Sequence, residues 1–226
     1  MSLKENIQQV KQRIKKACEK SKREENEVKM IAVTKYVGIE QTREVLDLGI
    51  EHIGENRVQY ALPKYEALSS MGVWHFIGHL QTNKVKQVVG KFDYIHSLDR
   101  LSLAEAIHKR ANQLQTKVKC FIQVNISGEE SKGGVNPDEL IEFCKAIRQY
   151  DTIQVVGLMT MAPYTANQEL IRSVFRSLRE WRDQINQQKI FHEPIKELSM
   201  GMSNDFEIAI EEGATFIRLG SVLFKN

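Results

Sequence analysis

Residues 30–55 read MIAVTKYVGIEQTREVLDLGIEHIGE and contain the unit from which the fold is built. An apolar run, Met30–Lys35, is followed by a segment whose apolar residues have helical spacing, Ile39–Leu48, and then by a second short apolar run, His52–Glu55. A strand, a helix and a second strand in this order are the parts of a βαβ unit. The stretch therefore predicts strands that are joined by helices.

The same alternation continues to the end of the chain. The predicted strands are Met30–Lys35, His52–Glu55, Trp74–Gly78, Tyr94–Ser97, Lys119–Asn125, Gln154–Met161, Glu197–Ser199 and Thr215–Leu219. The predicted helices between them include Ile39–Leu48, Leu101–Gln115, Pro137–Gln149 and Leu170–Gln188. This pattern predicts an α/β fold, a (β/α)8 TIM-type barrel with an extra N-terminal helix.

The spacing and the length of the chain agree with a barrel. The first four strands begin near residues 30, 52, 74 and 94, which is about one compact strand–helix unit apart. An open doubly wound sheet is the alternative, but no Gly-x-Gly-x-x-Gly follows the first strand, where a dinucleotide-binding fold would have it. With 226 residues, 42% apolar and 27% charged, we expect one domain over residues 1–226, with the barrel at 29–226.

Residues 1–22 form the predicted extra helix. Its apolar residues recur at steps of four and three: Leu3, Ile7, Val10, Ile14 and Cys18. The net charge is only +3, and residues 1–29 hold nine Lys or Arg against five Asp or Glu. We interpret the segment as a helix that packs on the barrel and turns a basic face to solvent; an RNA- or membrane-binding arm is the alternative. The small overall surplus does not predict a nucleic-acid partner.

The cysteines and the N-terminus indicate the compartment. Cys18, Cys120 and Cys144 are far apart and form no Cys-x-x-Cys pair, so we predict reduced, packed thiols and no metal site. The N-terminus lacks a basic patch followed by an apolar segment, and no run of 18 apolar residues occurs. We therefore expect a cytoplasmic protein without a membrane partner.

Polar residues follow the predicted strands, at the barrel end where the sites of such folds lie. Lys35 ends the first strand, where its side chain could point into the barrel mouth. A lysine amine that loses its proton in such a place can form a Schiff base with an aldehyde. The alternative is a lysine whose ammonium reaches solvent at a strand end.

The loops after strands seven and eight suggest a phosphate site. Ser199–Asn204 supplies two hydroxyls and a glycine that would let the backbone approach a ligand, just before a helix predicted to start near Asn204. Gly220 and Ser221 follow strand eight, and barrels often bind phosphate at these two loops. Alternatively, Ser203 or Asn204 is a plain helix cap.

Two further residues lie within apolar strands. Arg218 is flanked by Ile217 and Leu219, so its charge needs a partner, either an internal Asp or Glu or an acceptor on a ligand. His75, between Trp74 and Phe76, is interpreted first as a hydrogen-bonded core histidine and second as a ligand contact. Walker, His-Glu-x-x-His and Gly-x-Ser-x-Gly motifs are absent from the sequence, which removes the usual support for NTPase or hydrolase activity.

Several sequence blocks carry a resemblance. They are Ala32–Lys35, Gly54–Asn56, Trp74–Lys84, Ser131–Gly134, Gly157–Met159 and Leu198–Ser203. Together they resemble the pyridoxal phosphate homeostasis protein family, and the Trp-His-Phe-Ile-Gly and Ser-Met-Gly-Met-Ser blocks are its most specific marks here. The blocks are spread over nearly the whole chain.

The resemblance implies a barrel like the N-terminal domain of alanine racemase, with pyridoxal 5′-phosphate (PLP) held as a Schiff base on Lys35. It implies that Ser203, Gly220 and Ser221 surround the phosphate and that Arg218 faces the pyridine nitrogen. The other implied cofactor-binding residues are Asn56, His75, Met159, Ser199, Gly201 and Met202. If this is right, the charges that matter most are those of two buried residues, Lys35 and Arg218.

The resemblance also implies a function, which is PLP homeostasis without catalytic turnover. An arginine opposite the pyridine nitrogen can donate a hydrogen bond but cannot accept one, so the ring would be a weak electron sink. Racemisation also needs a second acid or base, which the resemblance places in a further domain, and we expect none after Asn226. The alternatives are a PLP-dependent racemase or lyase, a Schiff-base aldolase that uses Lys35, or a binding module that acts through the basic helix. Expected partners are PLP and PLP-dependent apoenzymes, and the expected state is a monomer or weak homodimer.

Overall fold

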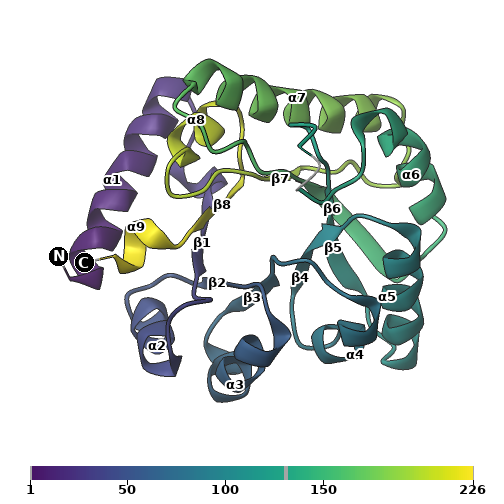
Figure 1. Cartoon of the computed structure of the whole chain (residues 1–226), viewed down its shortest axis with the longest axis horizontal. Coiled ribbons are helices and arrows are strands. Elements are labelled where there is room, and N and C mark those ends of the chain that lie inside the picture. The colour runs from purple at the N-terminus through teal and green to yellow at the C-terminus, as the bar shows by residue number, and fades with distance from the viewer. Residues whose placement is uncertain (1, 130–131, 226) are drawn as a thin grey trace.

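Eight parallel strands close into a barrel in chain order, as the sequence predicted (Figure 1). The computed structural model describes residues 2–129 and 132–225, which leaves Ser131 of the Ser131–Gly134 block outside the described residues. Within these ranges the strands are β1 (Lys29–Val33), β2 (His52–Glu55), β3 (Val73–Phe76), β4 (Tyr94–Leu98), β5 (Val118–Gln123), β6 (Ile153–Met159), β7 (Glu197–Ser199) and β8 (Phe216–Leu219). The chain therefore has the (β/α)8 TIM-barrel fold with an N-terminal helix.

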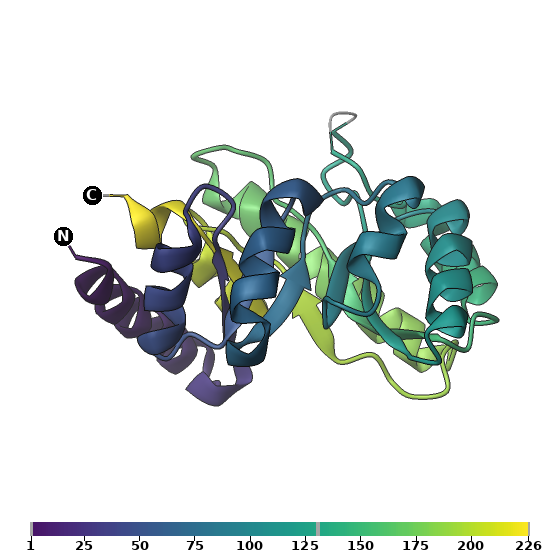
Figure 2. The ribbon, with the colours of Figure 1, turned by 90° about the horizontal axis from the view of Figure 1, so that it is seen from below.

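Helices surround the strands on the outside of the barrel (Figures 1 and 2). In the described ranges they are α1 (Leu3–Ser21), α2 (Ile39–Asp47), α3 (Val58–Leu68), α4 (Val85–Val88), α5 (Leu101–Gln113), α6 (Leu140–Ile147), α7 (Gln168–Gln187), α8 (Phe206–Glu211) and α9 (Ser221–Phe224). Short 3-10 turns lie at Glu25–Glu27, Ser69–Met71, Thr82–Lys84 and Pro137–Glu139. None of the helices described is long and apolar enough to cross a membrane.

Alternating side chains of the strands build two apolar layers. Ile31, Phe121, Met159 and Phe216 form one buried cluster, and Ala32 belongs to the larger core with the helices. Successive strand residues point to opposite faces, so one set fills the barrel and the other holds the helices. The inside of the barrel is thus packed, and space for a ligand must lie at one of its ends.

The pairing of β1 with β8 closes the barrel and sets the position of the site. Ile31 lies opposite Arg218, and Ala32 lies opposite Leu219. Both strands run in the same direction, so the residues that follow them reach the same end of the barrel. Lys35 and Gly220 therefore reach the same end of the barrel although they are far apart in sequence.

Four strands end two residues earlier than predicted, among them β1, which ends at Val33 and not at Lys35. The backbone turns after Val33: the N–H of Val37 donates to the Thr34 carbonyl oxygen at 3.0 Å. An apolar run does not show where such a turn begins. The helix α3 was not among those named from the sequence, because Pro63, normally a helix breaker, lies inside it.

The N-terminal helix α1 packs on the barrel with its apolar stripe. Ser2 and Glu5 form a capping box at its start, and Ile7, Val10 and Ile14 are buried. In both ribbon views α1 lies beside the yellow C-terminal helix α9 (Figures 1 and 2). The stripe is covered by the protein itself, so it is not open to another surface.

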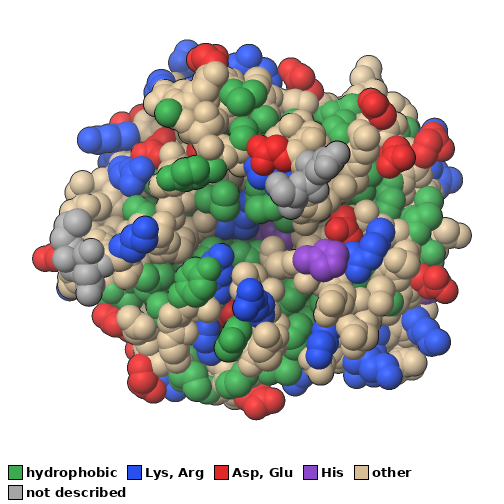
Figure 3. Space-filling model, viewed as in Figure 1, with side chains coloured by type: hydrophobic (Ala, Val, Ile, Leu, Met, Phe, Trp, Pro, Cys, Tyr) green, Lys and Arg blue, Asp and Glu red, His purple; other side chains and the backbone are tan. Residues whose placement is uncertain are grey.

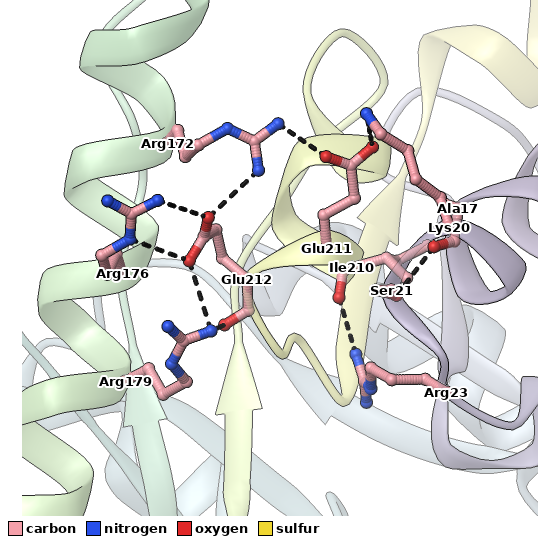
Figure 4. A network of polar contacts seen from close by, with 10 residues as sticks. All are labelled: Ala17, Lys20, Ser21, Arg23, Arg172, Arg176, Arg179, Ile210, Glu211 and Glu212. Atoms are coloured by element: carbon pink, nitrogen blue, oxygen red, sulfur yellow. Dashed lines mark hydrogen bonds and ion pairs between the residues drawn. The ribbon is translucent and has the colours of Figure 1, made fainter.

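An ion-pair network fixes α8 between α1 and α7 (Figure 4). Glu212, the residue after α8, accepts from Arg172 and Arg176 of α7, and Glu211 accepts from Arg172 and from Lys20 of α1. Burial alone would raise the pKa of Glu212, but the hydrogen bonds from Arg176 and Arg172 outweigh it and lower that pKa. The network holds the helix that follows the loop after β7.

Candidate functional site

A cavity of about 1140 Å³ opens at the carboxyl ends of the strands. Figure 3 looks onto this end and shows the hollow at its centre, with basic side chains inside it. The lining residues are Val33, Lys35, Tyr36, Val37, Gln41, Asn56, Ile77, Gly78, His79, Gln123, Lys132, Gly133, Met161, Met202, Ser203, Asn204, Arg218, Gly220, Ser221, Phe224 and Lys225. They come from loops that follow most of the strands, as expected for a barrel site.

Lys35 lies in the turn after β1 and lines the cavity. Its Nζ is 4.9 Å from the centre of the Tyr36 ring, and that tyrosine side chain is 90% exposed. The expectation that Lys35 is buried is wrong: the residue is partly exposed because the chain has left the barrel before it. Its amine is thus accessible from the cavity mouth.

A buried ion pair lies directly behind Lys35. Lys64 of α3 donates to the Glu55 carboxylate at 2.7 Å and to the Thr34 carbonyl oxygen at 2.6 Å. The Thr34 hydroxyl donates to the same Glu55 oxygen at 2.6 Å. Thr34 and Glu55 immediately precede the cavity residues Lys35 and Asn56, so this triad holds two loops of the site. Sequence reasoning missed Lys64, although Glu55 in the Gly54–Asn56 block is a charged residue that needed a partner.

Arg218 of β8 is buried, and its side chain reaches the cavity. Its guanidinium donates to the Ser199 hydroxyl oxygen at 2.6 Å and to the Thr160 carbonyl oxygen at 2.9 Å. In the described part of the chain no carboxylate lies within ion-pair distance, so the partner is not the Asp or Glu considered above. Burial lowers the pKa of Arg218 to about 10, with the Asp205 charge acting in the opposite direction, so the side chain stays charged at neutral pH.

Backbone N–H groups after β8 converge on Ser203. Its hydroxyl oxygen accepts from the N–H groups of Gly220 and Val222, at 3.4 and 3.2 Å. Ser203, Gly220 and Ser221 all line the cavity. Because its oxygen accepts from two N–H groups, the Ser203 hydroxyl proton is left to donate to an anionic oxygen in the cavity.

Gly201 has a packing role in the loop after β7. Its φ is +93°, and a Cβ there would lie 2.6 Å from the Cβ of Ala209 in α8. Asp205 tightens the same loop by accepting from the N–H of Met202. The glycine therefore lets α8 pack against the loop, and it does not line the cavity.

The structure brings seven of the predicted cofactor-binding residues to the cavity wall: Lys35, Asn56, Met202, Ser203, Arg218, Gly220 and Ser221. The other four, which were expected to line the pocket, do not: His75, Met159, Ser199 and Gly201. Met159 packs inside the barrel with Phe121 and Phe216, because its strand position points inward below the cavity. Ser199 is buried beneath Arg218, and His75 is hydrogen-bonded at both ring nitrogens to His52 and His96.

Lys132 and His79 are among the lining residues that were not assigned a role from the sequence. Lys132 donates to the Ala162 carbonyl oxygen at 2.9 Å and pairs with Glu129 at 3.0 Å. His79 stands at the rim, with its Nδ1 3.7 Å from a carboxylate oxygen of Asp99. Both belong to blocks that carried the resemblance, but a block does not show which of its side chains face the cavity.

Comparison with known proteins gives the family. The family model for the N-terminal domain of alanine racemase matches residues 2–226. A pyridoxal phosphate homeostasis protein of Aquifex aeolicus is 48% identical over 97% of this chain and 96% of its own length. One from Escherichia coli K12 is 34% identical over 97% of this chain and 94% of its own length.

Solved structures agree. PipY of Synechococcus elongatus PCC7942, with PLP bound, is 36% identical, has a TM-score of 0.82 and is matched over 88% of this chain and 92% of its own. An alanine racemase of Clostridium difficile 630 has a TM-score of 0.81 over 100% of this chain and 56% of its own, but at 13% identity it shows the fold alone. The chain thus belongs to the pyridoxal phosphate homeostasis protein family, which has the fold of the alanine racemase N-terminal domain.

Proposed function

We propose that this protein binds PLP in the cavity through a Schiff base on Lys35 and serves PLP homeostasis without catalytic turnover. One observation carries the proposal: a lysine amine, a buried arginine and a group of hydroxyl and N–H donors line a single cavity. The PLP bound to PipY and the names of the curated relatives support it.

The residues present fit the group. PLP would supply an aldehyde, which condenses with a primary amine with loss of one water. Lys35 offers that amine from a partly exposed position. Ser203 and Ser221 offer hydroxyl donors for the phosphate beside the Gly220 backbone, and Arg218 offers N–H groups for the pyridine nitrogen. A cavity of about 1140 Å³ is also large enough for a cofactor of this size.

The charge of Arg218 favours a carrier over a catalyst. With a pKa of about 10 the guanidinium keeps its protons at neutral pH, so it can only donate to the ring nitrogen. A ring nitrogen held unprotonated withdraws electrons weakly, and this gives little support for carbanion chemistry on a bound amino acid. Arg218 would therefore bind the cofactor without activating it.

The cavity mouth favours exchange of the cofactor. Lys35 is partly exposed, and the neighbouring Tyr36 side chain is almost wholly exposed. An incoming amine, such as the active-site lysine of a PLP-dependent apoenzyme, could therefore replace the Lys35 amine. Transfer to such apoenzymes is the partner interaction that we propose.

A second candidate function is catalysis by the same site, as an amino-acid racemase or lyase or as a Schiff-base aldolase. The His79 and Asp99 pair at the rim favours it, since a histidine beside a carboxylate can act as general acid or base. His79 lines the cavity, so it could reach a substrate bound near Lys35.

Visible absorption tests the proposed binding. Titration of the purified chain with PLP is expected to give the yellow band of an imine, and Lys35→Ala is expected to abolish it. Lys145→Ala, which changes an exposed lysine of α6, is the matched control and should keep the band. A band of equal intensity in Lys35→Ala would refute the role of Lys35, and no imine band in any form would refute the Schiff base.

Turnover separates the two candidate functions. The loaded protein is incubated with a panel of amino acids, and the products are separated on a chiral column. A carrier gives at most one equivalent of product per protein. Many equivalents, abolished by Lys35→Ala and reduced by His79→Gln, would establish the enzyme instead.

A further inference from the structure

Three histidines form a continuous hydrogen-bonded line through the barrel. His52 Nδ1 lies 2.9 Å from His75 Nε2, and His75 Nδ1 lies 2.9 Å from His96 Nε2. His96 Nδ1 lies 2.9 Å from the Ser199 hydroxyl oxygen, which accepts from Arg218. The line therefore connects the start of β2, at the far end of the barrel, with the arginine at the cavity.

The two inner rings are held firmly and are neutral. His75 stacks on Tyr94 at 4.6 Å between ring centres, and His96 stacks on Phe121 at 4.3 Å. Both are buried, and burial lowers the pKa of each well below its usual value. A neutral imidazole has one N–H donor and one acceptor nitrogen, so each ring must accept at one end and donate at the other.

Arg218 sets the direction of the line. A guanidinium only donates, so the Ser199 oxygen accepts from it, and the Ser199 hydroxyl proton is left to donate to His96 Nδ1. His96 then donates from Nε2 to His75, and His75 donates from Nε2 to His52. If every ring donated in the opposite direction, His96 would donate to Ser199, and the Ser199 hydroxyl proton would have no acceptor in the described part of the chain. All three rings should therefore carry their proton on Nε2.

We propose that His52, His75 and His96 are positioning residues for Arg218: they fix the Ser199 hydroxyl so that its lone pairs face the guanidinium, and they link that contact to the protonation of His52. The effect on a bound cofactor rests on the function proposed above, whereas the direction of the line does not. Sequence reasoning considered only His75, and as an isolated residue.

Protonation of His52 reverses the line. His52 gains one proton on Nδ1, so Nδ1 becomes a donor and His75 must accept at Nε2. Along the hydrogen bonds, one proton shifts at each contact: His75 Nε2 gives its proton to His52 Nδ1, His96 Nε2 gives its proton to His75 Nδ1, and the Ser199 hydroxyl gives its proton to His96 Nδ1. One proton taken up from solvent restores the Ser199 hydroxyl, so the line gains a single proton in total and His96 donates to Ser199. The serine oxygen now accepts from both His96 and Arg218, while its own proton turns away. The contact that holds Arg218 is weakened as a result.

His52 is the accessible end of this line. It is partly exposed, and its ring is perpendicular to that of Phe216. Burial and then the Lys29 charge lower its pKa, while the carboxylates of Glu51, Asp93 and Glu197 act in the opposite direction. His75 is its ring neighbour on β3. Acidification should therefore protonate His52 before the two inner rings.

Nitrogen NMR of the ligand-free protein tests the direction of the line. With ¹⁵N-labelled histidine rings at pH 8, we expect His52, His75 and His96 all to carry the proton on Nε2. On acidification, the inner rings should change to the Nδ1 form with the same midpoint as His52. A mixture of tautomers at pH 8, or inner rings that ignore the titration of His52, would overturn the proposal. His192→Gln, which removes an exposed histidine, should leave the pattern unchanged.

PLP affinity gives a second and separate test. The dissociation constant for PLP is measured at pH 8 and at pH 5.5 in the wild type and in His52→Gln. The factor by which it rises on acidification should be roughly two to ten times larger in the wild type, which is the range expected for one neutral hydrogen bond. Equal pH dependence in the two proteins would contradict the link to Arg218. If neither protein binds PLP, the proposed function fails, and the NMR pattern still decides whether the line exists.

Discussion

Replacing Lys64 by methionine should be among the most destabilising single changes in the protein. The Lys64 side chain is 7% exposed and that of Glu55 is 0% exposed, and their charged atoms are 2.7 Å apart. Methionine keeps the apolar stem but leaves the Glu55 carboxylate buried without a cation. The other Glu55 oxygen, Oε2, already has no hydrogen-bond partner in the described chain. The carboxylate would then depend on the Thr34 hydroxyl alone.

The expected cost follows from this burial. Removing one partner of a buried ion pair costs about 3–5 kcal/mol, because a charge is left uncompensated in a medium of low dielectric constant. For a chain of this size, that corresponds to a fall in melting temperature of roughly 6–20 °C, at about 2–4 °C per kcal/mol. The double variant Lys64→Met/Glu55→Leu removes both charges and should recover most of the loss.

Lys145→Met provides a matched control, since Lys145 forms an ion pair of 2.6 Å with Glu142 on the surface. These side chains are 49% and 76% exposed, so the change should cost about 0–1 kcal/mol. Urea unfolding followed by tryptophan fluorescence measures all the variants. Our interpretation of the triad would be refuted if Lys64→Met cost no more than Lys145→Met, or if the double variant were less stable than Lys64→Met.

Three further predictions concern pH, close packing and thiol reactivity. Burial lowers the pKa of His75 and His96 in the folded state, so the unfolded chain binds more protons than the folded chain below about pH 6.5. The free energy of unfolding should therefore fall as the pH decreases from 7.5 to 5.5, by up to about 1.4 kcal/mol per pH unit for each histidine. Urea midpoints that stay constant over this range would contradict the prediction. Gly157→Ala would place a Cβ 1.8 Å from a carbonyl oxygen of β7, so we expect a loss of about 3 kcal/mol or more in urea unfolding, whereas Gly38→Ala, with nothing within 4 Å, should be tolerated. Burial raises the pKa of Cys144 to about 12, so a thiol reagent at pH 8 should modify it only after unfolding, and rapid labelling of the native protein would be the opposite result.

The fold could be predicted because its evidence is local. Each strand and most helices have their own pattern of apolar residues, and the alternation of the two does not depend on distant contacts. The strand ends were less accurate. Lys35 was placed on β1, but the turn that begins at Thr34 depends on a hydrogen bond to Val37 that an apolar pattern does not reveal.

The site was predictable where a residue follows a strand and less so where it lies within one. Asn56, Ser203 and Gly220 follow strands and therefore reach the cavity. Met159 lies within a strand, and the level of its side chain along the barrel depends on register, which the sequence does not reveal. For the same reason nothing in the sequence joined His75 to His96, because the contact forms between adjacent strands.

The partners of buried charges were the least predictable feature. Arg218 was correctly expected to need a partner, but the carbonyl and hydroxyl groups that serve it come from β7 and the loop after β6. Lys64 faces Glu55 only because α3 packs against β2. Such pairs are fixed by tertiary packing, so a single sequence shows the need but not the partner.

The central claim is that Lys35 carries the cofactor, and peptide mapping after reduction tests it most directly. The purified protein is mixed with PLP, reduced with borohydride, digested and analysed by mass spectrometry. We predict one pyridoxyl group per chain, on the peptide that contains Lys35, and none at that position when PLP is omitted. Modification mainly at another lysine, such as Lys132, with Lys35 unmodified would contradict the claim.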